Sequence, residues 1–189
     1  MGWKPRGINA CYSFECRSFC VDEQAVPLSK PEAELYRSIV QKLIYICKRA
    51  RPDIDPALSS LSTRVTNPTK DCQKKLYRVL DFLKNTLEDD QVIGASNLGK
   101  VYMWVDASFA VHHNMQSHTG GTMSFRTGII HTKSSKQKLN TRKSTEVELV
   151  AVSNFLPYHI WMGNFMKSQG YALKKKILFQ DNQSAIKME

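Results

Sequence analysis

The chain lacks the features that mark membrane proteins and secreted proteins. No apolar segment approaches the roughly 18–20 residues that a membrane-spanning helix needs, so no membrane partner is expected. The N-terminal residues contain no apolar core of the kind found in a secretory signal. We therefore expect an intracellular protein, cytoplasmic or nuclear, that is not secreted.

Cysteine is scarce and poorly arranged for either disulfides or zinc. The sequence has 5 Cys, an odd count, and Cys11, Cys16 and Cys20 lie close together. A structural zinc site needs four ligands, usually in well-spaced pairs, and no His lies near these three. We interpret the cysteines as free thiols in a reducing compartment.

Acidic residues are few relative to basic ones. Lys and Arg total 27 against 17 Asp and Glu, which gives a net charge of +10 and a pI near 9.4. Most of the excess lies in the half from Ala95 to Glu189. Such a surface attracts polyanions through Coulomb forces and counterion release, which favours a nucleic-acid partner. A basic surface without a specific partner is the alternative.

With 189 residues, 42% of them hydrophobic, the chain has room for one ordinary domain or two small ones. Residues 1–30 show no sustained hydrophobic period and are predicted to form a poorly structured leader. Apolar residues at helical spacing predict a small helical unit over residues 31–94, with helices around Leu35–Cys47, Ile54–Leu61 and Leu76–Leu87.

Residues 95–189 show the alternation and short apolar runs of a sheet combined with a helix. We predict a mixed four-stranded sheet whose first three strands are antiparallel, while the fourth returns beside the first through a right-handed crossover. A helix beginning at Ser144 packs on one face. The fold class is therefore α/β (α+β). The expected strands are Val101–Asp106, Thr122–Phe125, Gly128–Thr132 and Ile177–Phe179.

Three acidic residues occupy unusual positions in these predicted elements. Asp106 interrupts an apolar and aromatic strand, Glu148 follows the start of a helix among core residues, and Asp181 comes just after the last apolar strand. Burying a carboxylate costs free energy unless it is paired or bound to a metal. Together the three could form an oxygen-ligand site for Mg²⁺. Acids at strand ends are, however, also commonly just exposed.

Basic residues follow the third predicted strand. Lys133, Lys136 and Lys138 are candidate nucleic-acid-binding residues, because contacts to phosphates add affinity with little sequence preference. A merely solvated loop or strand edge is the alternative.

Histidine and tryptophan receive structural interpretations. His112, His113 and His118 follow the first strand, and we expect a surface loop rather than a metal site. Trp104 and Trp161 are expected to be core aromatics.

Several sequence blocks also resemble one known family. In the second half they follow one another in a fixed order: Val105–Ala110, Thr119–Gly121, Ser134–Lys138, Ser144–Glu148 and Asp181–Ile186. In the first half the blocks are Tyr36–Val40, Leu43–Tyr45, Arg51–Ile54 and Arg78–Thr86. In this order they resemble the end of the reverse transcriptase and the ribonuclease H domain of copia-type (Ty1/copia) retrotransposon polyproteins.

The resemblance implies a reaction and a site. Ribonuclease H cleaves the RNA strand of RNA–DNA hybrids with two Mg²⁺ ions, or with Mn²⁺. The metal-binding and catalytic carboxylates of the family correspond to Asp106, Glu148 and Asp181. Glu146 is not among them, because side chains two residues apart on a helix point about 200° apart.

The sequence also differs from the family in two respects. The paired-Asp motif of the polymerase is absent, so DNA synthesis is not predicted. The family's fourth acidic residue would lie downstream of Asp181, where the sequence stops at Glu189, so we expect a ribonuclease H-like domain without its last strand and helix. Two functions follow: a hybrid-cleaving nuclease fragment, or a catalytically inactive retroelement relic that binds nucleic acid non-specifically or is only partly folded. By family resemblance the chain is a ribonuclease H-type endonuclease, and we expect the truncated chain alone to be inactive.

Overall fold

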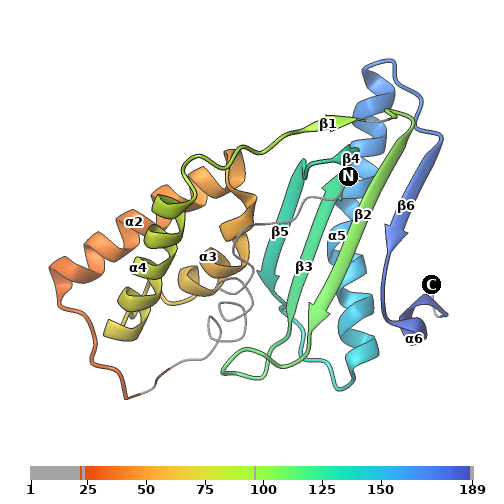
Figure 1. Ribbon diagram of the computed structural model, residues 1–189. Helices are drawn as coiled ribbons and strands as arrows, with labels where there is room; N and C mark the ends of the chain where they lie inside the picture. The colour runs from red at the N-terminus through yellow and green to blue at the C-terminus, as the bar shows by residue number, and fades with distance from the viewer. Residues whose placement is uncertain (1–21, 23, 96, 188–189) are drawn as a thin grey trace.

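A computed structural model of the chain describes residues 22, 24–95 and 97–187 (Figure 1). Most of the expected leader lies outside these residues, as do Cys11, Cys16 and Cys20. Cys47 and Cys72, which are described, are buried free thiols. Within residues 1–30, Pro27 forms an isolated bridge with Thr69, so the last part of this segment is already tied to the helical unit.

The first unit is helical, as predicted. Its elements are α2 (Lys30–Arg49), the 3₁₀ turn η1 (Pro52–Ile54), α3 (Asp55–Ser62) and α4 (Lys70–Asn85). The third expected helix was too long at its end, because α4 stops at Asn85. Leu87 lies beyond that end and is 74% exposed. It is therefore not part of the buried face of α4.

Local chemistry determines where these helices begin. At the start of α2, the Glu32 carboxylate accepts hydrogen bonds from the Ser29 backbone N–H (3.0 Å) and hydroxyl (2.7 Å). This satisfies an N–H that has no partner within the helix. Thr69 caps α4 by accepting from the Cys72 N–H. The buried faces of the helices share one apolar core: Tyr36, Val40, Leu43, Ile54, Leu58, Leu61, Leu76 and Val79.

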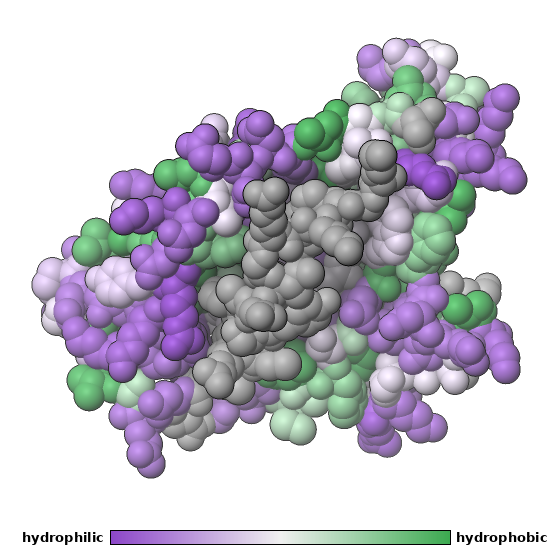
Figure 2. Space-filling view, viewed as in Figure 1, coloured by the Kyte–Doolittle hydropathy of each residue, from purple (hydrophilic) through white to green (hydrophobic). Residues whose placement is uncertain are grey.

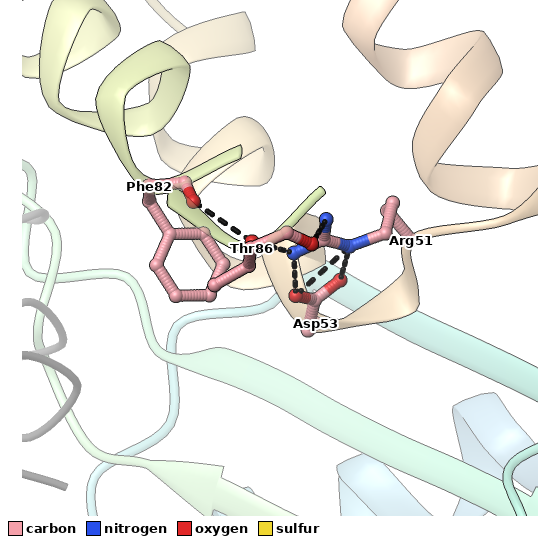
Figure 3. Close-up of polar contacts among 4 residues, drawn as sticks. All are labelled: Arg51, Asp53, Phe82 and Thr86. Carbon is pink, nitrogen blue, oxygen red and sulfur yellow. Dashed lines mark hydrogen bonds and ion pairs between the residues drawn. The ribbon is translucent and has the colours of Figure 1, made fainter. Parts of the chain in front are cut away.

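Arg51 joins the 3₁₀ turn to the end of α4 (Figure 3). Its guanidinium donates to both carboxylate oxygens of Asp53 (3.0 and 2.7 Å) and to the carbonyl and hydroxyl oxygens of Thr86 (3.0 and 2.6 Å). It also lies over the Phe82 ring, 5.5 Å from the centroid. These charge-assisted contacts hold η1, and with it Pro52, in a fixed position.

The second unit is a mixed sheet with the predicted topology. Its strand order is β5–β3–β2–β6, with β2, β3 and β5 antiparallel and β6 parallel to β2. A separate two-stranded sheet pairs β1 with β4. The strands are β1 (Gly94–Ala95), β2 (Lys100–Ser108), β3 (His118–Ser124), β4 (Arg126–Thr127), β5 (His131–Lys136) and β6 (Lys175–Phe179).

Two strand predictions were displaced. The second strand begins at His118 rather than Thr122, because residues 118–121 pair with β2 even though two of them are glycines. The third spans His131–Lys136 rather than 128–132. Between them Arg126 and Gly128 adopt positive φ (92° and 70°), which turns the chain and lets β4 pair with β1.

Helix α5 (Ser144–Ser168) connects β5 to β6 and lies behind the sheet in Figure 1. The alternate residues Val101, Met103 and Val105 of β2 point toward it and pack with Phe155 in a second apolar core. Tyr102, Trp104 and Asp106 consequently face the opposite side of the sheet.

The helical unit lies beside the sheet edge formed by β5, where α3 contacts β5 (Figure 1). Lys48 connects the two units: its ammonium pairs with Asp55 at 2.7 Å and donates to the Thr132 carbonyl of β5 at 3.4 Å. Hydrophilic residues predominate over the visible surface of this unit in Figure 2. Over the described ranges, no helix combines the length and apolarity needed to span a membrane.

Candidate metal centre

Asp106, Glu148 and Asp181 converge at one end of the sheet. One carboxylate oxygen from each lies within 4.8 Å of the others. Asp106 is near the end of β2, Asp181 is two residues beyond β6, and Glu148 is in the second turn of α5. The structure therefore brings together all three acidic residues that the sequence analysis selected.

Strand pairing explains the approach of the two aspartates. Trp104 of β2 is the register partner of Phe179 in the parallel strand β6. Asp106 follows two residues after Trp104 within β2, and Asp181 lies two residues after Phe179, just past the end of β6. Alternation along β2 places Asp106 on the same face as Trp104, and both aspartates lie at the same end of the two paired strands. Helix α5 supplies Glu148 from the covered face.

The three carboxylates differ in environment. Glu148 is 6% exposed, whereas Asp106 and Asp181 are exposed. Burial raises the pKa of Glu148, and the neighbouring charges of Asp106 and Asp181 raise this pKa further. A hydrogen bond from the Gln180 side chain (3.2 Å) acts in the opposite direction. Hard oxygen donors that repel one another are the donor set that fits Mg²⁺, whose charge would relieve the repulsion.

Gln180 is a contributor that the sequence analysis missed. Its amide nitrogen donates to Glu148, while its side-chain oxygen accepts from the Asp181 N–H at 2.9 Å. Asn182 caps the short helix α6 (Gln183–Ile186) by accepting from the N–H groups of Ser184 and Ala185. The chain on both sides of Asp181 is thus fixed by side-chain hydrogen bonds. In the sequence, the feature that could have identified Gln180 and Asn182 was their position directly before and after Asp181.

Glu146 points away from the cluster. It is exposed, and its carboxylate accepts a hydrogen bond from the Arg142 N–H (2.9 Å) just before α5. This matches the expectation from helix geometry that only one of Glu146 and Glu148 faces the site.

An open pocket adjoins the carboxylates, with a volume of about 480 Å³. Asp106 and Asp181 line it together with Trp104, Gly120 and Ser134 of the sheet and Pro52 of the helical unit. Gly120 is the register partner of Asp106. Because glycine has no side chain, the pocket floor beside Asp106 allows close approach of a ligand.

The three candidate lysines do not lie on one surface. Lys133 and Lys136 belong to the edge strand β5, in odd and even positions, so their side chains leave opposite faces. The Lys133 ammonium lies 4.8 Å from the centroid of the Tyr158 ring of α5 and 3.2 Å from its hydroxyl. Lys138 follows the strand and is exposed. A strand edge was one of the two structures expected here, and the phosphate contacts stay a prediction.

The expectation of a histidine surface loop was wrong for two of the three residues. His112 and His118 are 9% and 6% exposed. Their rings share a hydrogen bond of 3.0 Å, and the second nitrogen of His118 lies 2.7 Å from the Ser134 hydroxyl. Burial lowers the pKa of His118 to about 4 and also lowers that of His112. His113 is exposed, as expected.

The core prediction was wrong for both tryptophans. Trp104 is 41% exposed and Trp161 is 58% exposed. Trp104 lies on the face of β2 that α5 does not cover, and it stacks on Phe179 with ring centroids 5.2 Å apart. Trp161 lies on α5 and stacks on Phe165.

Comparison with known proteins gives retroelement relatives. The chain is 31% identical over 152 residues, 80% of its length, to the retrovirus-related Pol polyprotein from transposon TNT 1-94 of Nicotiana tabacum. It is 24% identical over 175 residues, 88% of its length, to the transposon Ty1-ER2 Gag-Pol polyprotein of Saccharomyces cerevisiae. These alignments cover 11% and 10% of the two polyproteins, so the chain spans about a tenth of their length.

A short protein matches as well. The secreted RxLR effector protein 161 of Plasmopara viticola is 27% identical over 128 residues, which cover 67% of the chain and 90% of that protein. No protein-family model matches the chain, and no solved structure is a significant match. Apart from this effector protein, the relatives named here, at 24–31% identity over 80–88% of the chain, are copia/Ty1 retrotransposon Pol polyproteins, which supports a fragment of a retroelement.

Proposed function

We propose that this chain carries the metal site of a ribonuclease H-type nuclease and acts on the RNA strand of RNA–DNA hybrids. The observation that carries the proposal is the convergence of Asp106, Glu148 and Asp181 within 4.8 Å. The resemblance of the surrounding blocks to the copia-type ribonuclease H domain supports it, as does the similarity to retrotransposon Pol polyproteins.

Asp106, Glu148 and Asp181 would hold Mg²⁺ or Mn²⁺ through their carboxylate oxygens. Bound Mg²⁺ supplies stabilisation of the attacking and leaving oxygens in phosphodiester hydrolysis. The residues around the carboxylates orient and admit the substrate. Gln180 holds Glu148 in place, and the glycine floor at Gly120 leaves room for a sugar–phosphate backbone next to Asp106. The net charge of +10 would favour binding of a polyanion.

A second candidate is a non-catalytic relic that binds nucleic acid. The metal-ligand group found among the described residues contains three carboxylates, whereas the family resemblance implies four. Two-metal hydrolysis needs ligands for both ions. We therefore expect slow cleavage, or none, from the 189-residue chain by itself.

An assay on a labelled RNA–DNA hybrid separates these candidates. The chain is compared with a version extended by the segment that follows the aligned region in the tobacco TNT 1-94 polyprotein. Mg²⁺-dependent cleavage by the extended version, abolished by Asp106→Asn, is the expected result. Robust cleavage by the unextended chain would show that three carboxylates suffice. Absence of cleavage by both versions, when both are folded and bind Mg²⁺, would contradict the nuclease proposal.

A further inference from the structure

Two parallel strands carry matched residues toward the carboxylates on the face that α5 leaves open. In the register of β2 and β6, Lys100 pairs with Lys175, Tyr102 with Ile177, and Trp104 with Phe179. Asp106 is the next residue of β2 on this face, and Asp181 follows two residues beyond the end of β6. A pair of lysines, a band of large apolar rings and the metal-site carboxylates therefore follow one another along one surface.

The rings form a continuous stack, which we call the aromatic face: Tyr102, Trp104 and Phe179. Ring centroids lie 6.1 Å apart for Tyr102 and Trp104 and 5.2 Å apart for Trp104 and Phe179, with interplanar angles of 24° and 12°. Trp104 and Phe179 are 41% and 43% exposed. Large rings that remain this exposed beside a pocket are typical of a binding surface rather than a core.

Positive charge surrounds this band at the end away from the carboxylates. The Arg126 guanidinium lies 5.9 Å from the centroid of the Tyr102 ring. Lys175 is exposed, and Lys100, its register partner, is partly exposed. Rings for stacking combined with flanking cations are the features that bind single-stranded nucleic acid without reading its sequence.

We propose that the aromatic face binds the unpaired bases of a single-stranded nucleic acid, whose phosphates contact Arg126, Lys100 and Lys175. Paired bases in a duplex already stack on their neighbours, so a single strand gains the contact and a blunt duplex does not. The proposal deepens the nuclease proposal by adding a single-stranded segment to its substrate. It concerns binding alone and is tested without metal, so cleavage and stacking can fail separately.

The test uses a single-stranded RNA that contains the fluorescent base 2-aminopurine, with EDTA present. Stacking on the aromatic face quenches the fluorescence, and titration with the full chain gives an affinity. A blunt RNA–DNA hybrid of the same sequence serves as the duplex competitor. We expect Trp104→Leu to weaken single-strand binding at least about fivefold, since loss of one stacking ring costs that much or more. This competition also gives the affinity of each protein for the blunt hybrid. We expect that affinity to be the same for the parent chain and for Trp104→Leu.

Trp161→Leu is the matched control, because it removes an exposed, stacked tryptophan from α5 instead of the open face. Trp104→Phe keeps a ring and should retain most of the affinity, and Phe179→Leu should repeat the loss. Circular dichroism verifies that each variant is folded. Equal effects of Trp104→Leu and Trp161→Leu, or no quenching with the parent chain, would overturn the proposal.

Discussion

Gly121 lies against the ring of Phe155, and a side chain at Gly121 would occupy the space that this ring fills. Gly121 is the register partner of Val105 on the face of the sheet that α5 covers. Phe155 is fully buried and belongs to the same helix as Glu148, seven residues further along α5. The absent side chain at Gly121 therefore lets α5 approach the sheet closely enough to bring Glu148 to the aspartates.

We expect Gly121→Ala to destabilise the protein by about 1–3 kcal/mol, because the added methyl group overpacks the contact with Phe155. Chemical denaturation measures the change. Gly120→Ala is the matched control, since a methyl group there meets only the Asp106 carbonyl oxygen at 3.8 Å. Equal destabilisation by both variants would show that the Phe155 contact does not position α5.

Glu148→Gln should stabilise the metal-free protein. Burial and two neighbouring carboxylates raise the pKa of Glu148 above its ordinary value of 4.5. The folded state therefore holds this proton more tightly than the unfolded state. That contribution to stability is present below pH 4.5 and is lost as pH rises through the raised folded-state pKa. Thermal unfolding in EDTA should show an advantage for Glu148→Gln that grows with pH and then levels off. A variant less stable than the parent at neutral pH would contradict this reading of the cluster.

The histidine pair should make the fold sensitive to acid. The pKa of His118 falls to about 4 in the folded state, against an ordinary value of 6.5. The unfolded chain therefore binds the proton first, and stability is lost as pH falls from about 6.5 toward 4. His118→Asn removes this titration and should flatten the pH profile of unfolding in that window. An unfolding profile of His118→Asn that is as steep as that of the parent chain between pH 6.5 and 4 would contradict this account.

Nucleic-acid affinity should fall steeply with salt, because phosphate contacts release counterions. The structure separates the three candidate lysines. Lys136→Ala and Lys138→Ala should each lower the slope of log affinity against log salt by about 0.9, as expected for one lost phosphate contact. Lys133→Ala should lower it less, because the Lys133 ammonium lies against Tyr158. Filter binding at several salt concentrations measures the slopes. A salt-independent affinity would exclude phosphate contacts altogether.

The sequence predicted the helices because helical spacing is a local pattern, and it predicted the strand order from the right-handed crossover rule. The grouping of the three acids rested on the family resemblance, since their spacing alone left simple exposure open. Helical spacing identified α2 and α4, and alternation in β2 separated Val101, Met103 and Val105 from Tyr102, Trp104 and Asp106. Alternation assigns residues to two faces but does not say which face a helix will cover. Trp104 was therefore assigned to the core although it shares a face with Asp106.

Other features depend on contacts between distant segments. His118 is buried because it begins β3 and forms a hydrogen bond with Ser134 of β5. The sequence around His118 is polar and does not indicate this burial. Gln180 supports Glu148 across 32 residues of sequence. Neither relationship produces a period or a spacing in the chain.

Mg²⁺ affinity measured by isothermal titration calorimetry tests the central claim most directly. The parent chain and Glu146→Gln should bind with equal affinity, because Glu146 is turned away from the cluster toward the Arg142 N–H. Asp106→Asn and Glu148→Gln should each lose more than the roughly tenfold that removal of a supporting partner costs. Equal Mg²⁺ affinities in all four proteins would contradict the assignment of this carboxylate cluster as the metal site.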